Sequence, residues 1–163
     1  MLSCCILVNQ SYTLADWTED IALASSHGVD GFALNVGSNP WQPKQVAAAF
    51  AAASGSPFKL FLSFDMTSLP GSSRSDATFL RDLVLACADS PNQLRWNGKV
   101  VVSTFGGENC TFGERSVSAG WRSALKDKMP PVSGSLAWNY KSFIRFCSSR
   151  RRCISSLHSS ISR

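Results

Sequence analysis

Four short apolar segments alternate along the chain with segments whose apolar residues recur at helical spacing. Each apolar segment has the length of a buried strand, and each following segment is amphipathic. Buried strands joined by such helices are typical of βαβ units, whose strands form a parallel sheet. The sequence therefore predicts an α/β fold. The expected strands are Cys4–Val8, Gly31–Val36, Lys59–Asp65 and Lys99–Phe105.

The expected helices begin at capping residues and end near glycine or proline. Thr13 caps the first helix, Pro43 opens the second, Ser75 caps the third, and the fourth covers residues 116–128. In the second helix the inward stripe is predicted to be Val46, Ala47, Phe50 and Ala51. A turn at Asn97-Gly98 leads into the last strand.

Two architectures fit this pattern, a small doubly wound sheet and the first half of a (β/α)8 barrel. With 163 residues the chain is well short of the roughly 250 of a full barrel. No glycine-rich loop follows the first strand, where residues 8–11 read VNQS, so a Rossmann dinucleotide site is disfavoured and no cofactor is expected.

Polar residues follow the predicted strands at the rim where their carboxyl ends converge. Asp65 ends an otherwise apolar strand, and it is either a site residue or an Asp that caps the following turn. Trp41 is expected either to stack on a sugar ring or to cover a helix. Asn, Asp, Glu and Trp around one rim suit a carbohydrate. The candidate substrate-binding residues are Asn35, Trp41, Asp65, Thr104 and Glu108.

The net charge of +5 comes from the end of the chain. Residues 1–129 contain all eleven acidic residues and ten of the sixteen basic ones, whereas residues 130–163 contain no acid. We therefore divide the chain into a domain at 1–129 and an irregular basic tail at 130–163. Arg150–Arg152 could contact nucleic acid or an anionic membrane, but a solvated tail is the favoured interpretation, so neither partner is expected.

Six scattered cysteines and two histidines show no metal-ligand spacing, so no metal site is predicted. No apolar run has the roughly 20 residues needed to cross a bilayer. Met1–Val8 reads as a strand rather than a signal peptide. Asn9 and Asn109 begin N-glycosylation sequons, which matter only in a secreted chain and can arise by chance.

Several segments, in order and at these separations, resemble the catalytic domain of fungal glycoside hydrolase family 71, the endo-α-1,3-glucanases or mutanases. They are NQSYTLADWTEDIALASSHGVDGFALNVGS, FKLFLSFDM, NGKVVVSTFGGENCTFG and GWRSALKDK, within residues 6–129. The resemblance implies a (β/α)8 barrel, inverting hydrolysis of α-1,3-glucan, no metal, and secretion or a cell-wall location. It matches Asn35, Asp65 and the loop Thr104–Glu108 to family positions at the barrel mouth.

The chain departs from the family in its second half. The proposed acid and base of the family lie in a later motif of the form WNDYGES, and Trp138–Lys141 shares only its Trp-Asn. No catalytic role therefore transfers with it, and Asp65 is expected to bind or support rather than act as the general acid. The resemblance implies the first half of the enzyme, a fragment inactive alone, joined to an unrelated tail. A truncated or misread gene would produce such a chain.

Other interpretations stay open beside hydrolysis. The chain could be a non-catalytic glucan-binding fragment that uses Asn35, Trp41 and Asp65, or a binder that acts through its basic tail. Half a barrel would leave two apolar sheet edges, so self-association is expected. If the chain is oxidised, Cys87 and Cys110, which flank the fourth strand, are the expected bridge; the alternative is two free thiols.

Overall fold

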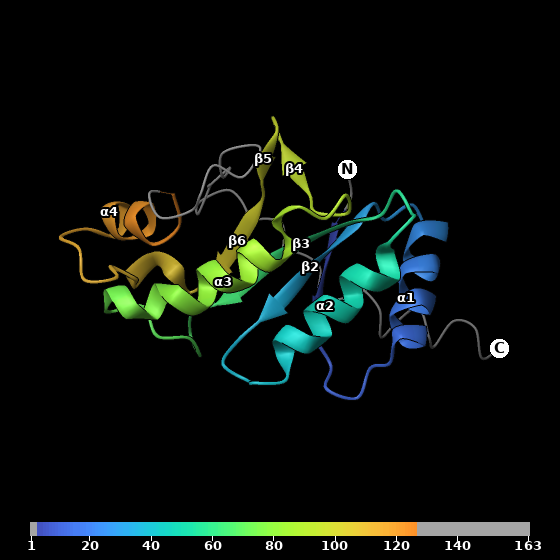
Figure 1. The fold of residues 1–163 in the computed structure, drawn as a ribbon, viewed down its shortest axis with the longest axis horizontal. Coiled ribbons are helices and arrows are strands. Elements are labelled where there is room, and N and C mark those ends of the chain that lie inside the picture. The colour runs from blue at the N-terminus through green and yellow to red at the C-terminus, as the bar shows by residue number, and fades with distance from the viewer. Residues whose placement is uncertain (1–2, 127–163) are drawn as a thin grey trace.

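A four-stranded parallel sheet lies at the centre of the computed structural model, which describes residues 3–126 (Figure 1). Its strands are β1 (Ser3–Leu7), β2 (Gly31–Val36), β3 (Lys59–Asp65) and β6 (Val102–Phe105), in the order β1-β2-β3-β6. Every neighbouring pair is parallel, and strand order follows chain order without a reversal. The predicted α/β fold with a parallel sheet is confirmed.

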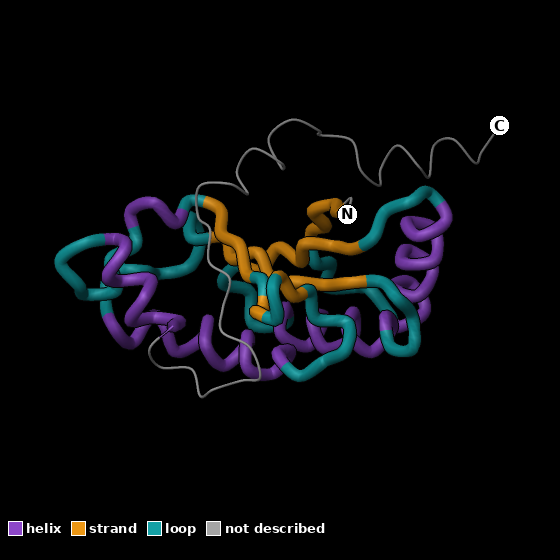
Figure 2. The backbone as a smooth tube through the Cα atoms, turned by 90° about the horizontal axis from the view of Figure 1, so that it is seen from above, coloured by secondary structure: helices purple, strands orange, loops and turns teal. Residues whose placement is uncertain are grey.

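Three helices, α1 (Leu14–Ser26), α2 (Gln42–Ala53) and α3 (Ala77–Ala88), lie along one side of this sheet, as the view in Figure 2 shows. The start of α1 is the predicted one, because the Thr13 hydroxyl and the Asp16 carboxylate cap each other's backbone amides. Alternate strand residues and the inner helix faces share one large apolar core, whose burial is the main stabilising term. Its members include Ile6, Trp17, Leu34, Phe50, Leu62, Leu80 and Val102.

The other set of alternate strand residues faces away from this core. Ala33, Phe61 and Val101 form a separate small cluster, against which Leu94 packs. Since side chains alternate along a strand, the polar residues two positions further along each strand share the orientation of this cluster. We call this side of the sheet the second face. Beyond the small cluster it carries Asn35, Ser63, Asp65, Ser103 and Phe105.

The predicted strand over residues 99–105 divides into two in the structure. β5 (Lys99–Val100) pairs antiparallel with β4 (Arg95–Trp96), and only β6 joins the main sheet. The predicted Asn97-Gly98 turn joins β4 to β5, with both residues at positive φ, as a tight two-residue hairpin requires. The hairpin extends from the sheet in Figure 1. The prediction was wrong because an apolar run does not reveal which partner each half takes.

The last described helical segment is irregular. α4 (Val117–Trp121) begins within one residue of the predicted start, and the Ser116 hydroxyl caps it by accepting from the Ala119 amide. It continues as one π-helical turn, η3 (Arg122–Lys126). The predicted end of this helix and the tail at 130–163 lie outside the described residues. Two short 3-10 turns, η1 (Arg74–Asp76) and η2 (Gly107–Asn109), complete the elements.

Two details of the predicted helices are wrong. Ala47 and Ala51 are exposed, and α2 instead buries Gln42, Gln45, Val46, Ala49, Phe50 and Ala53. The third helix is entered through Ser73 rather than Ser75, because the Asp76 carboxylate accepts hydrogen bonds from the amide and the hydroxyl of Ser73. Those bonds also lower the pKa of Asp76. None of the helices within residues 3–126 combines the length and hydropathy required for a membrane span.

Candidate functional site

Three polar side chains form a row across the second face. Asn35 of β2 lies in register with Ser63 of β3, and Ser63 with Ser103 of β6. Neighbouring strands lie about 4.8 Å apart, so the three side chains stand next to one another near the carboxyl ends of their strands. Ser63 is 8% exposed and Ser103 5% exposed, while Asn35 is half-buried. We call these three residues the polar row.

The polar row keeps its hydrogen-bonding capacity available. Within residues 3–126 no group donates to or accepts from the side chains of Asn35, Ser63 or Ser103. An amide and two hydroxyls supply both donors and acceptors in a confined strip. Among the described residues no fully buried side-chain nitrogen or oxygen lacks a partner, so the polar atoms of the row are still reached by solvent. A polar ligand on this strip would replace that solvent. Sequence reasoning had no signal for Ser63, which lies inside an apolar strand.

Asp65 extends the strip by two residues along β3 and is half-buried. Its Oδ1 accepts from the Thr67 amide at 3.0 Å and from the Thr67 hydroxyl at 2.6 Å. Among the described residues no donor meets Oδ2. The side chain therefore does cap the following turn, as one of the two interpretations proposed, and the same contacts hold the second oxygen in a fixed orientation.

An exposed aromatic ring stands beside this carboxylate. Phe105, the last residue of β6, is the register partner of Asp65 and is 61% exposed. The Met66 amide donates to the Phe105 carbonyl oxygen at 2.8 Å, which joins the two strand ends. Sequence reasoning missed Phe105 as a candidate, although strand alternation from Ser103 places it on the second face.

Two of the predicted site residues point elsewhere. Trp41 packs against the helix-side core, so it covers the start of α2 instead of the second face. Thr104 has the opposite orientation to Ser103 and Phe105, because it lies between them on β6. Its Oγ1 would lie 2.6 Å from a Cβ added at Gly107, which also approaches Trp121. Thr104 therefore does not share the face of Asp65. The packing of Trp41 fits the second of its two predicted roles, that of covering a helix.

Glu108 lies in η2, just beyond β6, and its side chain is exposed. Burial raises the pKa of the Cys110 thiol, and the negative charges of Glu108 and Asp76 raise it further. Glu108 thus lies near the loop that precedes α3. Its role in binding stays a prediction.

The predicted Cys87–Cys110 bridge is absent, and both residues are buried free thiols. Cys110 lies against Gly71 in the loop before α3, whereas Cys87 lies in the last turn of that helix. A helix of this length extends about 16 Å, far beyond the roughly 4.4–6.8 Å between the Cα atoms of a disulfide. Burial raises the pKa of Cys87 to about 11. Both sequon residues, Asn9 and Asn109, are exposed, and their glycosylation stays a prediction.

Buried glutamines of α2 fix the loops next to the site. The Gln42 Oε1 accepts from the Gly37 amide at 2.8 Å, directly after β2. Gln45 donates to the carbonyls of Gln10 and Tyr12, after β1, and accepts from the indole of Trp17 at 3.0 Å. These contacts hold the two loops that adjoin the polar row.

The Tyr12 side chain closes this network. Its hydroxyl donates to Asp20 Oδ2 at 2.9 Å, and its ring meets Trp17 edge-on. Burial, together with this carboxylate, raises the pKa of Tyr12 to about 12. The loop between β1 and α1 is thus anchored to both α1 and α2.

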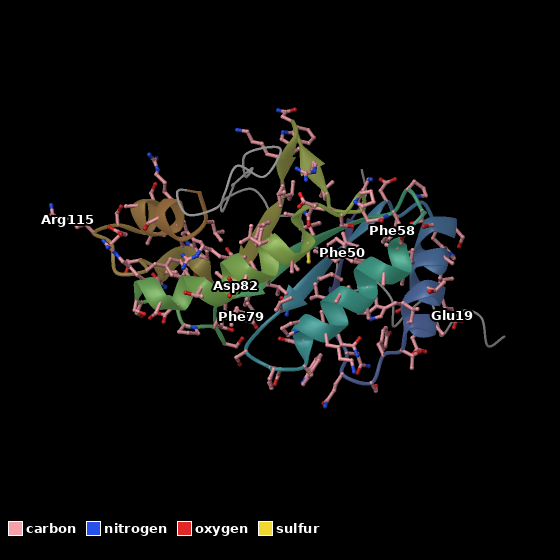
Figure 3. All side chains as sticks on the ribbon, in the orientation of Figure 1. Glu19, Phe50, Phe58, Phe79, Asp82 and Arg115 are labelled. Atoms are coloured by element: carbon pink, nitrogen blue, oxygen red, sulfur yellow. The ribbon has the colours of Figure 1, made fainter. Side chains whose placement is uncertain are left out.

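The groups at the site suit a ligand that is polar and uncharged. Within residues 3–126 no group of three or more His, Cys, Asp or Glu side chains is placed to hold a metal ion. The strip offers one carboxylate oxygen, one amide, two hydroxyls and an exposed ring. Of the charged residues that Figure 3 labels, Glu19 lies on α1, Asp82 on α3 and Arg115 in the loop before α4, all outside the strip. Hydroxyl-rich ligands with an apolar face match this set of groups.

Comparison with known proteins identifies relatives of one kind. The sequence model of glycosyl hydrolase family 71 matches residues 3–139. The chain is 49% identical over 120 residues to the glucan endo-1,3-alpha-glucosidase agn1 of Schizosaccharomyces pombe, and 36% identical over 121 residues to the ascus wall endo-1,3-alpha-glucanase of the same yeast. It is 37% identical over 101 residues to a mutanase of Penicillium rubens.

These matches cover most of the chain but little of each relative. They span 72%, 73% and 61% of the chain, and 27%, 27% and 22% of the respective relatives. The chain therefore corresponds to about a quarter of the length of these relatives.

Proposed function

Because the chain belongs to glycosyl hydrolase family 71, we propose that it forms the α-glucan-recognising first part of a glucan endo-1,3-α-glucosidase. At the level of the family, glucan hydrolysis is the function. The observation that carries the proposal is the polar row with Asp65 on the second face. These groups hold unused donors and acceptors where sugar hydroxyls could meet them.

We also infer that the sheet is the first half of a (β/α)8 barrel. A doubly wound sheet has helices on both faces and a reversal in strand order, and its ligand site lies at that reversal. Here strand order follows chain order, and α1, α2 and α3 share one side (Figure 2). In a barrel the second face would be the interior, and the carboxyl ends of the strands would form the active-site rim.

The proposed hydrolysis needs two carboxylic groups. In inverting enzymes one protonates the leaving oxygen and the other activates water, with about 6.5–9.5 Å between them. Asp65, tied to Thr67, suits a binding or electrostatic role on the glucan. The family's proposed acid and base belong to the later motif that the chain lacks. Trp138 and Asn139, which share its first letters, lie outside the described residues. We therefore propose that this chain alone binds α-1,3-glucan without cleaving it.

The proposal is tested by co-sedimentation of the full chain with insoluble α-1,3-glucan, with insoluble β-1,3-glucan as the specificity control. The expected result is retention on the α-linked polymer only. Equal retention on both polymers would contradict recognition of the α-1,3 linkage. Retention on neither would contradict glucan binding by this chain.

Asp65→Asn is expected to weaken that retention by about tenfold or more. The amide can still accept from Thr67 through its oxygen, but it replaces the available carboxylate oxygen with a donor. Hydrogen bonds to a charged group contribute roughly 1.5–3 kcal/mol, which corresponds to about 10–100-fold in affinity. Asp82→Asn makes the same change at an exposed position of α3 and is the matched control (Figure 3). Equal losses in both variants would argue against a role for Asp65.

Two further properties of the chain are proposed on the same basis. One relative is named for the ascus wall, so we propose a wall or extracellular location for this chain too. The described sheet has edges at β1 and β6, so we propose self-association through them.

A further inference from the structure

We propose that the Phe105 ring stacks on one glucosyl unit of the glucan and that Asp65 binds a hydroxyl of the same unit. This inference rests on the proposed glucan recognition, and it assigns one sugar unit to a place on the rim. Phe105 takes the sugar-stacking role that was one of the two predicted for Trp41, whose side chain packs against the core. The ligand is a pyranose ring of an α-glucan, held by contact with the ring face and by one hydroxyl.

Position distinguishes Phe105 from the other exposed apolar side chains. The large exposed apolar residues of the described chain are Leu14, Trp96 and Phe105. Isolated examples are normal on a protein surface and need no explanation. Leu14 opens α1, and Trp96 lies on the β4–β5 hairpin, away from the polar row. Phe105 alone of the three stands in register with a carboxylate on the second face.

The backbone on both sides of the ring is fixed. The Phe105 carbonyl accepts from the Met66 amide at 2.8 Å. Gly106 follows at φ 70°, and a Cβ added there would lie 2.8 Å from Thr67 Cγ2. The Trp121 indole donates to the Gly107 carbonyl at 2.9 Å. The chain that leaves Phe105 thus turns at Gly106 close to Thr67 and is held by a hydrogen bond at Gly107.

The same residue, Thr67, fixes both halves of the subsite. Its amide and hydroxyl hold Asp65 Oδ1, and its methyl group packs against the turn at Gly106. The Asp65 carboxylate and the backbone that carries the Phe105 ring therefore keep a constant relation without a ligand present. Pre-organisation of this kind lowers the entropy that binding must overcome.

The geometry matches one sugar unit. A pyranose has an apolar face of C–H groups and an edge of hydroxyls. Aromatic rings carry a negative face that attracts such C–H groups. Adjacent strands lie about 4.8 Å apart, so a ring placed over Phe105 brings an edge hydroxyl within reach of Asp65 Oδ2. Next along the face, the polar row would meet the following sugar unit.

The test compares four variants of the full chain for retention on insoluble α-1,3-glucan. Phe105→Ala removes the ring, and Phe105→Leu keeps apolar bulk without an aromatic face. Phe105→Tyr keeps the ring as the conservative variant. Trp96→Ala removes an aromatic side chain that is 68% exposed on the hairpin, and it is the matched control. Circular dichroism tests whether each variant is folded. If Phe105→Ala does not fold, the binding of Phe105→Leu is the deciding measurement.

We expect Phe105→Ala and Phe105→Leu to lower affinity about tenfold, while Phe105→Tyr and Trp96→Ala bind like the unmodified chain. Unchanged binding in the Ala and Leu variants, with binding by the unmodified chain intact, would overturn the subsite and leave the proposed function standing. An equal loss in Trp96→Ala would overturn it as well. No binding by the unmodified chain would overturn both.

Discussion

The 163-residue chain, incubated with α-1,3-glucan, is expected to release no reducing sugar above a heat-inactivated sample. Proton transfer by a positioned acid or base contributes roughly 10²–10⁴-fold each to the rate. The motif to which the family resemblance assigns the proposed acid and base is absent from this sequence. The glucan endo-1,3-alpha-glucosidase agn1 of Schizosaccharomyces pombe serves as the positive control on the same polymer.

Asp65→Asn and Glu108→Gln sharpen this experiment. If the chain does release sugar, each carboxylate whose substitution abolishes the release has a catalytic role. Activity in the unmodified chain would in any case contradict the division proposed here between recognition and cleavage. Binding without release, in one and the same sample, is the result that the account predicts.

Asn92→Asp is expected to destabilise the fold by about 3–5 kcal/mol, a large part of the total stability of a small domain. Asn92 is 2% exposed, and its Nδ2 donates to the carbonyls of Ala53, Ser56 and Phe58 at 2.8–3.0 Å. A carboxylate there would face three carbonyl oxygens without a proton to share. A charge left buried without a partner is among the most destabilising changes known in proteins.

The measurement is thermal unfolding, in which the melting temperature should fall by roughly 10 °C or more. Asn39→Asp makes the same substitution at an exposed position and should shift it little. Burial raises the pKa of the new carboxyl group in the folded state. The loss of stability in Asn92→Asp should therefore grow as the pH rises above the ordinary Asp pKa of about 3.9, and shrink below it. A deficit equal to that of Asn39→Asp, or independent of pH, would contradict this account of the α2–β3 connection.

The main strands could be predicted from the sequence because their signals are local. β2 and β3 have the predicted bounds, since each is a continuous apolar run that starts after a turn. The division of residues 99–105 could not be predicted in the same way. It depends on which strand each half pairs with: Val100 pairs with Arg95 across the hairpin, whereas Ser103 pairs with Ser63 in the main sheet.

The candidate site was predicted in part. The sequence places Asn35 and Asp65 at one rim, and strand register puts both on the second face. Thr104 was misplaced because the end of a strand does not by itself tell which face a residue takes. Phe105 was missed because an aromatic residue that ends an apolar run reads as core. Its register with Asp65 and its 61% exposure are properties of the folded sheet that the apolar run does not reveal.

The helix-side errors have a related cause. Gln42 and Gln45 are buried because they bind the Gly37, Gln10 and Tyr12 backbone, the last two from more than 30 residues away. A prediction from helical periodicity assumes that polar residues are exposed. It therefore placed Ala47 and Ala51 on the buried face of α2 in place of the two glutamines. Buried polar residues that organise loops leave no periodic signal.

The central claim is that the second face recognises a neutral α-glucan, and retention of the chain on insoluble α-1,3-glucan at two salt concentrations tests it most directly. Between about 50 and 200 mM salt, a protein held by 6–10 phosphate contacts loses roughly 10³–10⁵ in affinity. Hydrogen bonds and ring contacts to a neutral polymer should not change over that interval. Equal retention at both concentrations is the expected result. A steep loss, as expected for binding through Arg150–Arg152, or no retention at either concentration, would contradict it.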